Sequence, residues 1–146
     1  PPRVALAYAL LTMLIEHEIE IRVRYQETDG QGRVHHANYF TYFELGRTEL
    51  LRAAGWSYKQ FEADGLMLVV AQISCRYRQA AQYDDLLRLR TRTIRAKGAR
   101  IEHRYEVYRV QELIADGESV IACIGPGGRA SRLPSFLLYD PGGSAD

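Results

Sequence analysis

Residues 23–39 have the sequence Val23-Arg-Tyr-Gln-Glu-Thr-Asp29-Gly-Gln-Gly-Arg-Val-His-His-Ala-Asn-Tyr39 and join an alternating strand pattern to a helix pattern. The stretch places one carboxylate, Asp29, among turn glycines just before the predicted helix. The first N–H groups of a helix have no partner within the helix and lie at the positive end of its dipole. An acidic side chain beside such donors suits chemistry at an acyl carbonyl group.

The segments on either side of the Asp29 turn have clear periodicities. Residues 17–25 alternate between apolar and charged side chains, which predicts a half-buried strand. Asn38 is the predicted N-cap of a helix that runs to about Ala54 and is closed by Gly55. Because apolar residues cover most of its circumference, we expect this helix to be enclosed.

Two ion pairs are expected on the remaining polar face of the long helix. Glu44 and Arg47 have i,i+3 spacing, as do Glu49 and Arg52. A short second helix is predicted from Ser57 or Lys59 to Asp64.

Strand-like runs fill the second half of the chain. The short breaks between them predict an antiparallel meander. The four runs are residues 66–78, 85–96, 99–110 and 117–124, and residues 130–138 are a candidate for a last edge strand. The predicted fold class is therefore α+β, with an antiparallel five- to six-stranded sheet wrapped around a long central helix, which is the hotdog fold.

Length and composition indicate one ordinary domain. The chain has 146 residues, 47% of them hydrophobic and 25% charged. We expect an N-terminal extension at residues 1–16, a single domain at 17–138 and a flexible tail at 139–146. The apolar run at 4–15 is too short to span a bilayer. Two interpretations of it remain open, a helical turn packed on the domain and an extension upstream of a start at Met13.

The sequence argues against several classes of partner. A formal net charge of +1 does not favour nucleic-acid binding. His35 and His36 are neighbours without a third ligand nearby, so no metal site and no cofactor are expected. Cys75 and Cys123 are far apart and outside any CxxC motif, which is typical of reduced core residues in a cytoplasmic protein. No GxSxG motif is present.

The chain resembles the 4-hydroxybenzoyl-CoA thioesterase family of single-hotdog acyl-CoA thioesterases. The resemblance covers roughly Ile19 to Pro134, with Ala80 standing where members often carry Pro. The blocks that carry it are Val23-Arg-Tyr-x-Glu-Thr-Asp29-x-x-Gly32-x-Val34-x-His36-x-Asn38-Tyr39, Phe43-Glu-x-x-Arg47-x-Glu-x-Leu-Arg52, residues 77–86 and Gly128-Arg-x-x-Arg-Leu-Pro134.

The resemblance implies an acyl-CoA thioesterase in which Asp29 is catalytic, as general base or as nucleophile. It also implies that a helix-start amide near His36 polarises the thioester while the His36 side chain orients water or the ester. The predicted substrate-binding residues are Val34, His35, Asn38 and Tyr39. Glu44 is an alternative catalytic carboxylate, because a helix carboxylate serves in a related hotdog branch.

Basic residues at a tight turn are candidates for binding CoA phosphates. They are Arg95, Lys97 and Arg100, and the alternative is that they are solvated turn residues. The resemblance further implies a homo-oligomer, a dimer or a tetramer, with sites built from two subunits. The carrier of the acyl group is CoA or an acyl carrier protein.

Two other functions compete with hydrolysis. The first is a non-catalytic hotdog module that binds acyl-CoA or acyl carrier protein. The second is a hotdog dehydratase, which would need a different His/Asp layout on the helix. The sequence does not specify the acyl group.

Overall fold

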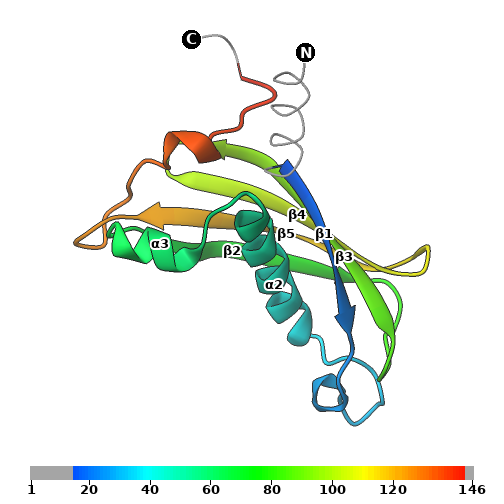
Figure 1. Cartoon of the computed structure of the whole chain (residues 1–146). Helices are drawn as coiled ribbons and strands as arrows, with labels where there is room; N and C mark the ends of the chain where they lie inside the picture. Colours follow the sequence, from blue (N-terminus) through cyan, green and yellow to red (C-terminus); the bar gives the residue numbers. More distant parts are fainter. Residues whose placement is uncertain (1–14, 144–146) are drawn as a thin grey trace.

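The framework of the protein is a five-stranded antiparallel sheet in the order β1-β3-β4-β5-β2 (Figure 1). A computed structural model describes residues 15–143. Its strands are β1 (Glu16–Arg22), β2 (Met67–Tyr77), β3 (Leu86–Lys97), β4 (Arg100–Arg109) and β5 (Glu112–Ile124). The predicted hotdog fold class is confirmed.

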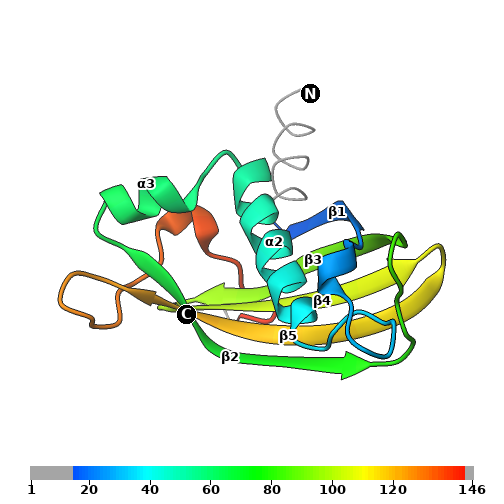
Figure 2. The ribbon, with the colours of Figure 1, turned by 90° about the horizontal axis from the view of Figure 1, so that it is seen from below.

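Two α-helices cover one face of the sheet. They are α2 (Asn38–Ala53) and the shorter α3 (Tyr58–Ala63), with 3-10 turns η1 (Tyr25–Glu27) and η2 (Ser135–Leu137). Figures 1 and 2 show α2 lying on the concave side of the curved sheet, with α3 beside it.

The core forms where α2 meets the middle strands. The rings of Phe43 and Tyr105 stack with their centroids 4.3 Å apart, and both side chains are fully buried. Gly117 on β5 permits this contact, because a Cβ atom there would lie 2.6 Å from the Phe43 ring and 2.3 Å from the Ser74 carbonyl oxygen. Aromatic packing of this kind dominates the burial that holds a helix on a sheet.

The ends of the helices match the sequence expectations in all but one respect. Gly55 follows α2 with a φ of +93°, and Ser57 caps α3 by accepting from the Gln60 N–H group. Asn38, however, is the first helical residue and not the N-cap. Ala37 holds the N-cap position without any side-chain hydrogen bond, so the N-cap prediction is wrong.

One of the two expected ion pairs on α2 is present. Glu49 and Arg52 form theirs, whereas Glu44 remains exposed and Arg47 turns inward, with 8% of its surface accessible. The outward face of α2 keeps Phe40 and Leu45 at 37% and 45% exposure, so the sheet encloses the helix on one side only.

The meander prediction is correct for β3, β4 and β5 and wrong for β2. Strand β2 pairs with β5 and not with β3, because β1 occupies the other edge of β3. Residues 78–85 therefore cross one end of the sheet and do not close a hairpin. Strand β5 begins five residues before the predicted start. Among the described residues, 130–138 form no sixth strand and contribute η2 and an isolated bridge from Ala130 to Ile124.

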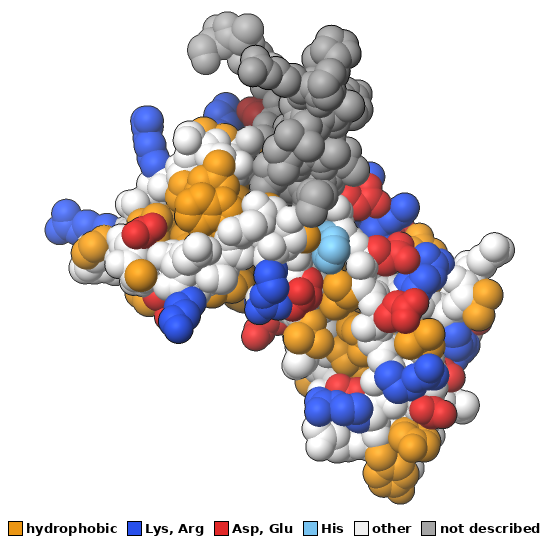
Figure 3. Space-filling view, viewed as in Figure 1, with side chains coloured by type: hydrophobic (Ala, Val, Ile, Leu, Met, Phe, Trp, Pro, Cys, Tyr) orange, Lys and Arg blue, Asp and Glu red, His pale blue; other side chains and the backbone are white. Residues whose placement is uncertain are grey.

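The predicted extension lies mostly outside the described range, whereas the first five residues of the predicted tail lie inside it. Residues 1–14 and 144–146 lie outside it, and β1 begins at Glu16. Tyr139 exchanges two backbone hydrogen bonds with Ala96 on β3. Neither helix within residues 15–143 is long and apolar enough to cross a bilayer. On the face in Figure 3, basic and acidic side chains are interspersed and form no field of one sign.

Candidate active site

Asp29 lies in a tight turn whose hydrogen bonds fix its carboxylate. Its backbone N–H donates to the Arg33 carbonyl oxygen at 2.8 Å, and its own carbonyl accepts from the Gly32 N–H at 3.0 Å. Gly32 has a φ of +77°, a conformation that favours glycine. The carboxylate atom Oδ1 accepts the N–H groups of Gln31 and Arg33 at 2.8 Å and 3.4 Å. No described residue donates to Oδ2, so one carboxylate oxygen is held and the other is free.

The turn borders an open hollow of about 470 Å³, within the size range of small-molecule sites. We call it the Asp29 hollow. Its lining residues come from the turn, the start of α2 and the end of β2, and they are Asp29, Gln31, Arg33, Val34, His36, Tyr39, Tyr77, Arg78, Gln79 and Ala80. The structure thus brings together four predicted site residues, namely Asp29, Val34, His36 and Tyr39.

The start of α2 leaves one backbone N–H group without an acceptor, that of His36. The N–H groups of Ala37 and Asn38 donate to the ring Nδ1 and the carbonyl oxygen of His35, at 3.1 Å and 2.9 Å. The Tyr39 N–H lies 3.4 Å from the His36 carbonyl oxygen. Among residues 15–143, nothing accepts from the His36 N–H. A free donor at the positive end of a helix can stabilise a carbonyl oxygen that becomes negative.

The His36 ring is exposed between two aromatic neighbours. It stacks on His35 with centroids 4.1 Å apart and meets the edge of Tyr77 at 6.4 Å. The Tyr77 hydroxyl donates to the His36 carbonyl oxygen at 3.0 Å, which ties β2 to the helix start. Burial raises the pKa of Tyr77 to about 12, so this hydroxyl keeps its proton at neutral pH.

Glu27 is a structural centre of the site to which sequence reasoning assigned no role. It is 7% exposed, and its Oε1 accepts from the Arg24 N–H at 2.7 Å and the Tyr42 hydroxyl at 3.0 Å. Its carbonyl oxygen accepts the His35 N–H at 2.9 Å and the Asn38 amide at 2.8 Å. These bonds fasten the Asp29 turn to α2. The only sequence signal was the position of this Glu inside the 23–39 block.

His35 and Asn38 do not line the Asp29 hollow. His35 bonds to the Ala37 N–H, and the Asn38 amide turns back to Glu27. The alternative carboxylate, Glu44, is exposed on α2 and does not line the hollow either.

The predicted CoA-binding residues lie far from Asp29 within one protomer. Arg95, Lys97 and Arg100 flank the β3–β4 turn, whereas the Asp29 turn lies beside Gln82, before β3 begins. The 12 residues of β3 separate the two places by roughly 36 Å. Arg95 and Lys97 both pair with Asp140, at 3.6 Å and 3.5 Å.

The thioesterase-like superfamily matches residues 23–140 of the chain. The chain belongs to this superfamily. An acyl-CoA thioesterase, YbgC of Haemophilus influenzae, is 34% identical over 108 residues, covering 73% of this chain and 79% of the relative.

Two solved structures share the fold of this thioesterase-like chain. One is named a probable thioesterase from Bartonella henselae, with a TM-score of 0.77 and 33% identity, covering 82% of this chain and 99% of the other. The other is a DHNA-CoA thioesterase from Staphylococcus aureus, with a TM-score of 0.78 and 29% identity, covering 82% and 81%. The sequence resemblance is confirmed at superfamily level, and the narrower 4-hydroxybenzoyl-CoA family stays a prediction.

Proposed function

We propose that this thioesterase-like protein hydrolyses acyl-CoA thioesters to a free acid and CoA at the Asp29 hollow. One observation carries the proposal. A carboxylate with one oxygen fixed and one free shares a hollow with His36, whose N–H group is unpaired at the start of α2. Acyl-CoA thioesters are favoured as substrates because the YbgC relative is named for them and the Staphylococcus neighbour for a CoA ester.

Asp29 supplies the oxygen in one of two ways. As a general base, Oδ2 takes a proton from water while the water oxygen bonds to the thioester carbon. As a nucleophile, Oδ2 itself forms that bond and gives a mixed anhydride, which water then hydrolyses to regenerate Asp29. On both routes the carbon–sulfur bond breaks, and CoA leaves as a thiolate that needs no strong acid.

The His36 N–H group donates to the carbonyl oxygen as it gains negative charge. A donor placed in this way lowers the barrier by about 3 kcal/mol. The His36 ring, held between His35 and Tyr77, orients the attacking water or the ester. Val34 and Tyr39 form the wall against which the acyl group packs.

A thiol-release screen tests the proposed activity. The full chain is incubated with CoA esters of short, medium, long and aromatic acids, and with an acyl carrier protein ester, while free thiol is measured. We expect release from at least one ester and a clear preference among chain lengths. Binding of the esters without any thiol release would contradict hydrolysis and leave a non-catalytic binding module.

We further propose that Arg95, Lys97 and Arg100 bind CoA phosphates at the site of a neighbouring protomer. Within one protomer their distance from Asp29 excludes a shared ligand. A Lys97→Ala/Arg100→Ala variant should raise the KM for acyl-CoA more than it lowers kcat, because phosphate contacts act mainly on binding. Lys59→Ala, which removes an exposed lysine on α3, is the control. An unchanged KM in the double variant would remove this assignment.

The protein is proposed to act as at least a dimer. Strand β2 has 11 residues, lies at the edge of the sheet and exposes Met67, Val70 and Tyr77. An edge strand whose outer side is unpaired can pair with a strand of another chain. Light scattering at micromolar concentration should give at least twice the mass of one chain. Val70→Lys, which places a charge on that edge, should shift the population toward the monomer. A monomeric wild-type protein would contradict the proposal.

A further inference from the structure

A second cavity lies inside the protomer at the opposite end of α2 from Asp29. Its volume is about 90 Å³, and we call it the α2 cavity. It is enclosed by the second half of α2, by α3, by the concave face of the sheet and by the η2 segment. The lining residues are Ile15, Arg47, Leu50, Leu51, Ala54, Tyr58, Leu68, Thr93, Ile101, His103, Ile121, Phe136, Leu137, Leu138 and Tyr139. None of them lines the Asp29 hollow.

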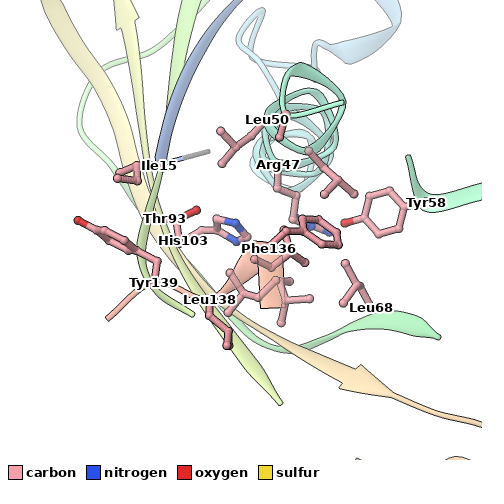
Figure 4. A pocket seen from close by; sticks show the side chains of 15 residues that line it. Ile15, Arg47, Leu50, Tyr58, Leu68, Thr93, His103, Phe136, Leu138 and Tyr139 are labelled. Carbon is pink, nitrogen blue, oxygen red and sulfur yellow. The ribbon is translucent and has the colours of Figure 1, made fainter. Parts of the chain in front are cut away.

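Arg47 brings a positive charge into this apolar space. The side chain is 8% exposed, and its Nη1 is buried without a hydrogen-bond partner. Figure 4 shows Arg47, His103, Tyr58 and Phe136 directed toward a common space. No ion pair among residues 15–143 includes Arg47, and the expected partner Glu44 stays on the exposed side of α2.

The other groups that contact Arg47 are neutral. Tyr58 and Tyr105 interact with it through their hydroxyl groups, and burial raises the pKa of both although Arg47 opposes the rise. Neutral hydroxyl groups can accept some of the hydrogen bonds that a guanidinium donates, but they do not balance its positive charge. A buried charge without a counter-ion is costly, which makes the cavity receptive to an anion.

His103 adds a second unpartnered polar atom. It lies on β4 with 7% exposure, and its Nδ1 is buried without a hydrogen bond. Burial, helped by the charge of Arg47, lowers the pKa of His103 to about 3. The imidazole is therefore neutral at physiological pH and can donate one N–H group to an oxygen ligand.

We propose that the α2 cavity binds a short-chain aliphatic monocarboxylic acid. The carboxylate pairs with Arg47 and accepts from His103, and the alkyl chain packs on Leu50, Leu51 and Phe136. A planar carboxylate matches the fork of a guanidinium and supplies the missing negative charge. The volume of the α2 cavity limits the length of the acid. A cavity of about 150 Å³ holds a benzene ring, and the α2 cavity is smaller, so an acid of roughly three to five carbons fits.

The site is separate from the proposed hydrolytic site. The 16 residues of α2 span about 24 Å, and the α2 cavity takes its lining from the last two turns while His36 precedes the first. The bound acid is thus a ligand in its own right and not a substrate positioned for attack by Asp29. Because the acid binds only the folded state of the chain, it should stabilise that state in proportion to the occupancy of the cavity.

Butyrate binding to the full chain tests the proposal. Isothermal titration and thermal unfolding are measured with butyrate, with 1-butanol as its uncharged counterpart and with sodium chloride as the ionic control. We expect saturable binding of butyrate, at least about tenfold tighter than 1-butanol, since charge-assisted hydrogen bonds exceed neutral ones by this order. In NMR spectra, the imidazole signals of His103 should shift on titration.

Variants locate the site. Arg47→Met removes the guanidinium and keeps an unbranched apolar side chain, and it should lose at least about tenfold in butyrate affinity, while Arg47→Lys should retain part of it. Ala54→Leu keeps Arg47 and fills the cavity, so it should abolish binding even if Arg47→Met folds poorly. Asp29→Asn should bind butyrate as the wild type does. Absence of saturable binding, unaltered affinity in Ala54→Leu, or loss in Asp29→Asn would each overturn the proposal.

Discussion

Asp29→Asn should fold like the wild type and lose thioester hydrolysis by a factor on the order of 10² or more. The asparagine carbonyl can accept the same two N–H groups, from Gln31 and Arg33, that Oδ1 accepts in the wild type. The turn is therefore preserved. An amide nitrogen then stands where Oδ2 is free, and it can neither take a proton from water nor attack the thioester carbon.

The measurement is kcat/KM for the best CoA ester of the thiol-release screen, with unfolding curves recorded in parallel. Glu44→Gln is the matched control, because it neutralises an exposed carboxylate on α2 outside the Asp29 hollow. It should keep normal turnover. Near-normal turnover in Asp29→Asn would contradict the assignment, and a large loss in Glu44→Gln would move the chemistry to the helix carboxylate.

Oxygen-18 labelling of the Asp29 carboxylate would establish the nucleophilic role, because the label enters this group only through a mixed anhydride. Repeated turnover in water enriched in oxygen-18 places the label in the Asp29 carboxylate when water attacks the aspartyl carbon of a mixed anhydride. A general base never bonds covalently to the substrate, so its carboxylate stays unlabelled. Mass spectrometry of the peptide that contains Asp29 reads the result.

Local patterns predicted the elements of this fold well. Alternation gave β1, and Gly55 gave the end of α2, since these features depend on neighbours in the chain. The position of β2 in the sheet depends instead on which edge β1 occupies, a contact between distant segments that periodicity does not encode. The short 78–85 connection favoured a hairpin for the same reason.

In the site, too, the sequence predicted the features that depend on local sequence and missed those that depend on contacts between distant segments. The block around Asp29 pointed to a carboxylate beside a helix start, and Asp29, Val34, His36 and Tyr39 do line one hollow. The i,i+3 spacing of Glu44 and Arg47 predicted a surface ion pair, yet the sheet buries Arg47 because it lies on the inner face of α2. The α2 cavity follows from that burial and has no local sequence signature.

Glu27→Ala should lower the free energy of unfolding by about 2–4 kcal/mol. The substitution leaves the Tyr42 hydroxyl, which is fully buried, and the Arg24 N–H without their acceptor. Burial raises the pKa of Tyr42 and the Glu27 carboxylate adds to this, so the hydroxyl keeps its proton and must donate it elsewhere. The ion pair with Arg24 contributes little, because 64% of that side chain is exposed.

Urea unfolding of Glu27→Ala, Glu27→Gln and Tyr42→Phe separates these contributions. Glutamine keeps an oxygen for Tyr42 and Arg24 and should recover most of the loss. If the buried hydroxyl is the main cost, Glu27→Ala combined with Tyr42→Phe will be less destabilised than the sum of the single variants, with a coupling of about 0.5–3 kcal/mol. A Glu27→Ala protein as stable as the wild type would mean that the bonds to the Glu27 carbonyl oxygen hold the Asp29 turn to α2, since this oxygen still accepts from the His35 N–H and the Asn38 side-chain amide.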